Sequence, residues 1–344
     1  MSFFGGDKNL NSYSTFVRYS LTISLIILFL LFGQNTMAQI VEDRTQTLVV
    51  AYPRQKVSFD PLHTFSITEA QLFTAVYEGL VAYDPITLNP IAGQAERWTI
   101  SPDRTVYTFY LRSDASFSNG DTLRAEDFRA SWLRIIDPSV AAEYSFLFDV
   151  IEGVEEYRSG VVSDLGQVGI KTLSEKVLEV KLAQPADHFL KVIAHHSFSA
   201  IHPSYIGAIN WGRNTNMIGN GPFQVSSWEN NKLLLKRNEH YWGRNQVEID
   251  RVEIRFYENP EKATESFMNG DIHWANTWSN TNKIIPYLVS NPLFATMYFY
   301  FCSDCKPFDD ERVRHGLALL LPWDSIRDNT DIFPPSDSLV PEIA

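Results

Sequence analysis

Alternating apolar and polar positions predict a chain of short strands interrupted by helices. Strand patterns occur at residues 45–51, 98–111, 171–182, 232–236, 251–256 and 296–301. We expect 98–111 to fold back at a turn near 101–104, and 171–182 to form one strand. Helical spacing occurs at 70–80 and at 309–321, where Val313, Leu317 and Leu320 share a predicted core face. This mixture, without a regular strand–helix–strand rhythm, predicts an α+β or irregular α/β protein.

Residues 117–128 read Phe-Ser-Asn-Gly-Asp-Thr-Leu-Arg-Ala-Glu-Asp-Phe and carry the sharpest local signal. Asn119 and Gly120 predict a tight turn that needs positive φ. Glu126 and Asp127 are acids of the kind that favour a helix N-terminus. The segment therefore predicts a turn followed by a helix.

The first 38 residues have the pattern of a secretory signal peptide. Lys8 and Arg18 precede an apolar run at 21–32, and Thr36 and Ala38 are small residues placed for cleavage before Gln39. An uncleaved anchor is the alternative, although a span needs about 20 apolar residues and this run is shorter. No cysteine follows the run for lipid attachment. We expect a soluble, exported, periplasmic protein.

Composition and motifs argue against several classes of function. The 344 residues are 44% hydrophobic, which is enough for two domains with real cores, and the net charge of −12 comes without a basic cluster for nucleic acid. No metal-binding, serine-hydrolase or phosphate-loop motif occurs. We interpret the histidines as structural, and Cys302 and Cys305 as an oxidised pair or two inert thiols. The sequence predicts no enzyme, no metal and no cofactor.

Several short motifs follow one another in a fixed order. They read Tyr-Glu-Gly-Leu at 77–80, Ala-Glu-Arg-Trp at 95–98, Tyr-Thr-Phe-Tyr-Leu-Arg at 107–112, the segment 117–128, Asn-Gly-Pro-Phe at 220–223, Tyr-Trp at 241–242, Gly-Asp-Ile at 270–272 and Phe-Asp-Asp-Glu-Arg-Val-Arg at 308–314. This series resembles the bacterial oligopeptide-binding proteins, the family 5 extracytoplasmic solute-binding proteins of ABC importers for peptides and nickel. The resemblance covers about residues 45–321.

The resemblance implies a type II periplasmic-binding-protein clamshell with an extra inserted domain. On this basis residues 1–38 are the signal peptide, 39–66 the first part of the first lobe and 67–190 the inserted domain. Residues 191–290 complete the first lobe, and 291–344 begin the second. Family members are longer, so the resemblance also implies a truncated chain that stops just inside the second lobe.

The resemblance implies four ligand-contacting positions. Tyr144 matches a tyrosine that reaches the ligand from the inserted domain, while Asn276 and Trp278 occupy the place of a cleft-lining tyrosine–asparagine stretch. Lys56 falls near an acidic residue that lines the cleft in oligopeptide binders, and a cation there would disfavour the same peptide register. Trp98, Trp132, Trp228 and Trp242 are interpreted as packing residues.

The resemblance implies a monomeric binding protein that hands a peptide ligand to ABC permease subunits in the membrane. Two other interpretations stay open: a binding module reused for sensing or adhesion, and a non-functional truncated remnant. An exported hydrolase is a third class, for which the sequence offers no nucleophile–base pair.

Overall fold

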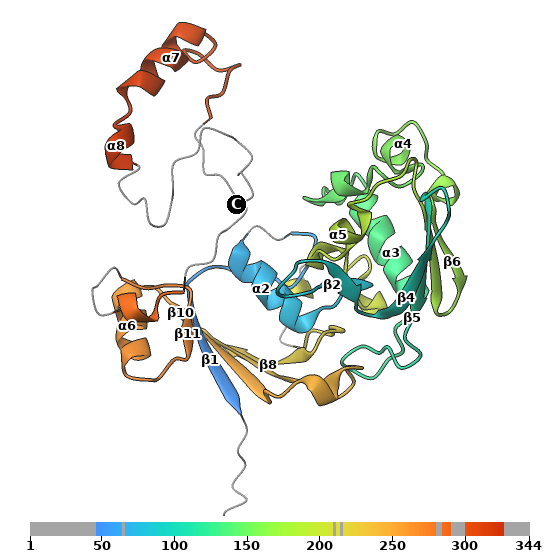
Figure 1. The fold of residues 1–344 in the computed structure, drawn as a ribbon, viewed down its shortest axis with the longest axis horizontal. Coiled ribbons are helices and arrows are strands. Elements are labelled where there is room, and N and C mark those ends of the chain that lie inside the picture. The colour runs from blue at the N-terminus through green and yellow to red at the C-terminus, as the bar shows by residue number, and fades with distance from the viewer. Residues whose placement is uncertain are drawn as a thin grey trace, which may run out of the picture. The chain divides into compact units, whose positions relative to one another are not determined.

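The computed structural model describes residues 46–63, 66–208, 211–213, 216–279, 284–289 and 300–326. The chain divides after Ser279 into two compact units, which are considered separately (Figure 1). The predicted signal peptide lies outside the described residues, as does most of the predicted strand at 296–301. No helix in the described ranges is long and apolar enough to cross a membrane.

A five-stranded sheet forms one side of the first unit. Its strands, in spatial order, are β11 (Trp274–Ala275), β1 (Thr47–Pro53), β10 (Arg251–Tyr257), β9 (Lys232–Arg237) and β8 (Phe223–Glu229). β1 runs parallel to both of its neighbours, whereas the pairs β10–β9 and β9–β8 are antiparallel. Leu233, Leu235 and Ile254 are almost fully buried. The apolar face predicted from the alternation is therefore the face that the sheet turns to the core.

A four-stranded antiparallel sheet forms the other side. Its order is β4 (Ala95–Ile100), β5 (Val106–Leu111), β7 (Val177–Lys181) and β6 (Ile170–Ser174), and a small pair joins β2 (Val81–Tyr83) to β3 (Pro90–Ala92). The single strand predicted at 171–182 is wrong, because the chain reverses between Ser174 and Val177. Leu178 and Val180 still face the core. Alternation shows which side chains face the core, but it does not show where the chain reverses. This turn contains neither glycine nor proline, the residues that usually mark a reversal.

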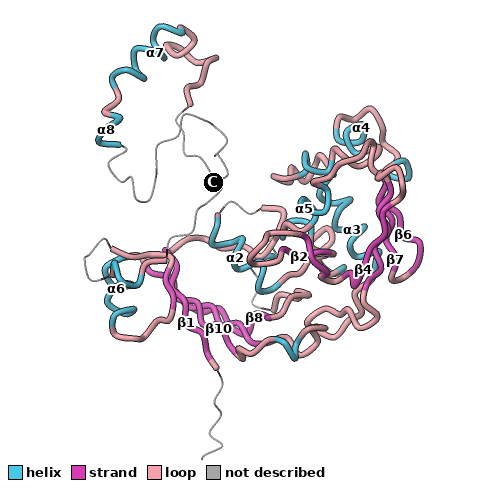
Figure 2. Tube along the Cα trace, viewed as in Figure 1, coloured by secondary structure: helices cyan, strands magenta, loops and turns pink. Residues whose placement is uncertain are grey.

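Helices α2 to α6 belong to the first unit with the two sheets, and α7 and α8 belong to the second unit (Figure 2). They are α2 (Ile67–Val76), α3 (Ala125–Ile136), α4 (Val154–Arg158), α5 (Phe189–Ile193), α6 (Pro260–Met268), α7 (Glu311–Leu320) and α8 (Trp323–Ile326). Gly120 has φ of +90° and Asp127 lies in the first turn of α3, as the sequence predicts. The helix predicted at 70–80 begins earlier, at a capping box in which the Ser66 hydroxyl accepts from the Glu69 N–H, and ends at Val76.

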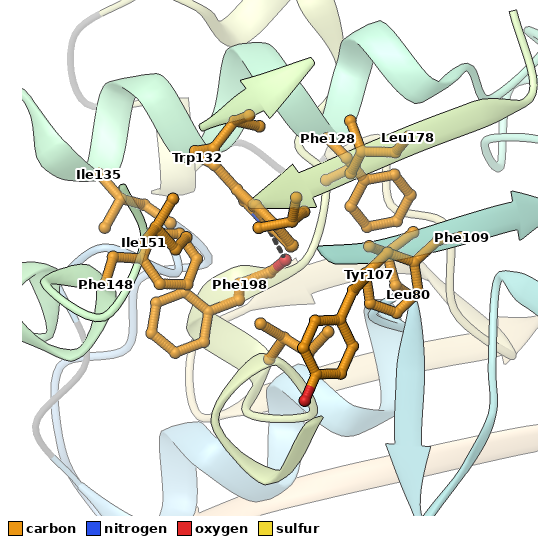
Figure 3. Packing of buried hydrophobic residues seen from close by; sticks show 14 of the residues in the cluster. Leu80, Tyr107, Phe109, Phe128, Trp132, Ile135, Phe148, Ile151, Leu178 and Phe198 are labelled. Carbon is orange, nitrogen blue, oxygen red and sulfur yellow. Dashed lines mark hydrogen bonds between the residues drawn. The ribbon is translucent and has the colours of Figure 1, made fainter. Parts of the chain in front are cut away.

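Aromatic residues build the core beneath the four-stranded sheet (Figure 3). Trp132 is fully buried, and its Nε1–H donates to the Phe198 carbonyl at 2.7 Å. The Phe148 ring stacks on Phe198 with centroids 4.3 Å apart. Trp132 is therefore a packing residue, as interpreted from the sequence. A second core, between α2 and the five-stranded sheet, holds Phe59 and Phe73.

The second unit, within residues 284–289 and 300–326, differs from the prediction in one respect. α7 forms close to the predicted range, yet Leu317 and Leu320 on its predicted core face are 37% and 80% exposed. Helical spacing predicts an apolar face but does not supply the surface that covers it. Cys302 and Cys305 form a disulfide, the first of the two states considered for them.

A buried ion pair joins the two sides of the first unit. Arg134 of α3 donates two hydrogen bonds, of 3.2 and 3.0 Å, to the carboxylate of Asp60, which follows β1. The side chains are only 14% and 11% exposed. Separating the pair would leave two buried charges without partners. The pair therefore stabilises the position of α3 relative to the segment that follows β1.

Asp60→Ala should lower the free energy of unfolding by about 3 kcal/mol, since Arg134 then loses its buried counter-ion. Arg134→Met in the same background should recover a large part of that loss by removing the orphaned charge. Urea unfolding of the two single variants and the double variant measures the coupling. If the losses of unfolding free energy in the two single variants simply added up in the double variant, the two side chains would not be coupled.

Candidate functional site

The candidate site lies where three parallel strands end. β1, β10 and β11 all point the same way, so the segments that follow them, residues 54–60, 258–259 and 276–279, meet at one edge of the sheet. The chain leaves β10 through α6 and returns as β11 on the far side of β1 (Figure 1). Ligands of open α/β sheets bind outside the carboxyl ends of strands at such a reversal of strand order. We call this region the strand-end edge.

Backbone contacts order the strand-end edge. The Asn276 N–H donates to the Ala51 carbonyl at 2.8 Å, which extends the pairing of β11 with β1. The Arg54 N–H donates to the Tyr257 carbonyl at 2.8 Å, and the Arg54 guanidinium forms an ion pair with Glu258. The segments after all three strands are thereby fixed to the sheet.

Three of the four residues predicted from the sequence lie on the segments of this edge. Lys56 is exposed on the segment after β1, and Asn276 and Trp278 follow β11. Trp278 is 40% exposed, and Trp274 of β11 is 42% exposed against Tyr52, with ring centroids 5.5 Å apart. Among the described residues the side chains of Lys56, Asn276 and Trp278 have no hydrogen-bond or ion-pair partner. The described residues therefore leave the polar groups of these three side chains open.

Tyr144 lies in the other half of the unit. It precedes the 3-10 helix Ser145–Phe148, and its ring meets His195 edge-on with centroids 4.9 Å apart. Tyr144 is half-buried beside the aromatic core, whereas the neighbouring Phe146 is 55% exposed. No contact in the described part joins Tyr144 to the strand-end edge, so its role as a ligand residue stays a prediction.

The sequence reasoning missed the carboxylate of Glu78, which lies between the five-stranded and the four-stranded sheets. We call the cluster around it, with Tyr241, Trp242, Arg112 and Asn220, the joint. The two oxygens of Glu78 accept from the Tyr241 hydroxyl and the Trp242 Nε1–H, each at 2.6 Å. The Arg112 guanidinium lies 3.4 Å above the Trp242 ring. Burial raises the pKa of Glu78 to about 7, against the lowering effect of these donors and of Arg112.

Asn220 completes this joint. It is fully buried, its side-chain oxygen accepts from the Glu78 N–H at 3.1 Å, and its amide donates to the Glu78 carbonyl at 2.8 Å. The Gln94 side chain donates to the Asn220 carbonyl at 2.9 Å. The motifs at 77–80, 220–223 and 241–242 therefore meet at one point. Their order along the chain was visible in the sequence, but their contacts were not.

A pocket along α3 and the contacts of His202 do not form a rival site. An open pocket of about 490 Å³ along α3, with Leu133 and Tyr157 in its wall, contains none of the four predicted residues. His202 Nε2 lies 2.9 Å from Asp121, and its Nδ1 lies 2.7 Å from the Ser204 hydroxyl. That Nδ1 also accepts the Ser204 backbone N–H at 3.3 Å, which is a helix-capping contact. No group of three metal-ligating side chains occurs in the described ranges.

Comparison with known proteins identifies the family. The model of the bacterial extracellular solute-binding proteins, family 5 (middle region), matches residues 89–343, and the chain belongs to this family. It is 30% identical over 293 residues to the periplasmic oligopeptide-binding protein OppA of Escherichia coli, covering 82% of this chain and 53% of the relative. It is 27% identical over 296 residues to the dipeptide-binding protein DppE of Bacillus subtilis, covering 82% and 52%.

Solved structures confirm the fold class. OppA of Burkholderia pseudomallei superposes with a TM-score of 0.78 at 25% identity, covering 87% of this chain and 61% of that one. The murein tripeptide-binding protein MppA of Escherichia coli gives the same TM-score at 23% identity, again covering 87% and 61%. The fold is that of the type II periplasmic binding proteins. The chain spans about half the length of the curated relatives it matches.

Glu78→Gln should flatten the dependence of stability on pH. The folded state holds the Glu78 proton up to about pH 7, whereas the ordinary carboxyl releases it near 4.5. The stabilisation is therefore full below pH 4.5 and is lost as pH rises toward 7, by roughly 3 kcal/mol at most. Urea unfolding across this window measures the slope, and the exposed Glu96→Gln is the control. Equal slopes for Glu78→Gln and the native chain would contradict this assignment.

Proposed function

We propose that the chain belongs to an exported solute-binding protein that holds oligopeptides at the strand-end edge and passes them to an ABC permease. The observation that carries the proposal is the edge itself: polar and aromatic side chains without described partners gather where parallel strands end, in a family 5 fold. The proposed protein is monomeric and periplasmic, and it binds its ligand without chemical change.

The relatives support a peptide as the ligand. Their names describe oligopeptide, dipeptide and murein peptide binding, and OppA of Haemophilus influenzae is known in complex with the peptide RPPGFSPFR. Another relative, 29% identical over 277 residues, is named a probable deoxycholate-binding protein of Escherichia coli. These names thus cover more than one class of molecule, and most of them name a peptide.

An extended peptide suits the geometry of the edge. β11 is a two-residue strand at the edge of the five-stranded sheet. An extended peptide can therefore form backbone hydrogen bonds with it as an added strand. Main-chain hydrogen bonds give affinity without a strong demand on ligand side chains. The division into a first lobe at 39–66 and 191–290, an inserted domain at 67–190 and a second lobe from 291 remains part of this proposal.

The chain should bind peptides without cleaving them. Incubation with a defined pool of tetrapeptides and nonapeptides, followed by mass spectrometry, should recover every peptide intact. Native mass spectrometry of the same samples should show peptide adducts on the protein. Fragments that increase in proportion to added protein would contradict the non-enzymatic part of the proposal, and a lack of adducts would contradict the binding part.

Tyr144→Ala should weaken peptide binding about two- to tenfold, the range expected for one lost aromatic contact. Its melting temperature should change little, because the ring is only half-buried and meets His195 at one edge. Phe146→Ala, an exposed aromatic two residues on, is the matched control. Unchanged affinity with a large loss of stability would make Tyr144 a packing residue.

A further inference from the structure

We propose that the strand-end edge prefers peptides that carry a side-chain carboxylate, and that Lys56 is the residue that makes this selection. The inference rests on the proposed function, because it assumes that the edge receives the ligand. It adds a preference among peptides, which the proposed function does not contain.

The charges that surround the edge leave Lys56 uncompensated. On the segments after β1 and β10, Arg54 is paired with Glu258. The first turn of α6 carries Glu261 beside Lys262, which are opposite charges next to each other. The segment 276–279 is neutral. These four charges cancel, so Lys56, which has no ion pair among the described residues, gives the edge one net positive charge on a protein whose net charge is −12.

The two acids closest in sequence to Lys56 on this side are already engaged. Asp60 is buried and held by Arg134. Glu69 is also buried, and its carboxylate accepts from the backbone N–H of Ser58 at 3.4 Å and from that of Ser66 at 3.3 Å. Neither carboxylate forms an ion pair with Lys56, whose ammonium is left for an anionic group from outside the protein.

The other available groups at the edge are also mainly donors. Asn276 offers an amide, and Trp274 and Trp278 each offer an indole N–H for which the described residues supply no acceptor. Carboxylate oxygens accept several hydrogen bonds at once, and those from a cation are the stronger ones. The half-exposed indole rings provide apolar area beside these donors. The chemistry that fits is an acidic side chain, in addition to the terminal carboxylate that every free peptide carries, on a partly apolar peptide.

Affinity for paired peptides tests the inference in the full 344-residue chain. Alanine tetrapeptides that carry either glutamate or glutamine at each position in turn are the probes, measured by titration calorimetry. In at least one position the glutamate peptide should bind about tenfold more tightly, the range for a hydrogen bond to a charged partner. Lys56→Met should remove that difference, because the glutamate peptides then lose their charged partner and weaken more than the glutamine peptides do.

Charge reversal provides the matched control. Lys56→Glu should favour the lysine-containing tetrapeptide over the glutamate one, whereas Lys171→Glu, an equal charge change on exposed β6, should leave the glutamate preference intact. Equal binding of glutamate and glutamine peptides to the native chain would overturn the inference and leave peptide binding standing. Loss of both peptides together in Lys56→Met would also overturn it. Binding of no peptide at all would overturn the proposed function as well.

Discussion

The buried carboxylate of Glu78 is the interaction on which the arrangement of the first unit depends. A carboxyl group removed from water needs hydrogen-bond partners, and here they come from both sides of the first unit. Tyr241 and Trp242 follow β9 of the five-stranded sheet, while Arg112 follows β5 of the four-stranded sheet. Glu78 itself lies two residues beyond α2. One ionisable group thus ties one helix and two sheets together.

The same joint explains why α2 stops where it does. The Val76 carbonyl accepts from the backbone N–H groups of both Asn220 and Gly221, and Glu78 donates its own N–H to the Asn220 side chain 142 residues away. A further helical turn would withdraw these groups from their partners. Gly221 lies so close to Val76 that a Cβ would approach its carbonyl carbon to 2.6 Å. Glycine is required there by contact between segments.

Features set by neighbouring residues could be predicted from the sequence, and features set by distant partners could not. The strands at 232–236 and 251–256, the Gly120 turn and the acidic start of α3 all depend on local pattern, and all form as predicted. The end of α2 depends on Asn220, and the reversal after Ser174 depends on the pairing of β6 with β7. Periodicity cannot show that β1 pairs with strands more than 200 residues later in the chain. Only the family resemblance could therefore suggest that Lys56 and Asn276 belong to one site.

The joint and the strand-end edge differ in how many of their polar groups form hydrogen bonds within the protein. Glu78 and Asn220 have their hydrogen-bonding groups occupied within the protein, which makes the joint rigid and costly to disturb. Lys56, Asn276 and Trp278 have side-chain groups that the described residues leave to water. Exposed donors cost little in the free protein, since water satisfies them, and they gain only when a ligand brings acceptors and excludes that water. The joint makes its hydrogen bonds within the protein and so holds the fold, whereas the donors of the strand-end edge are left to water, which the ligands that we propose would replace.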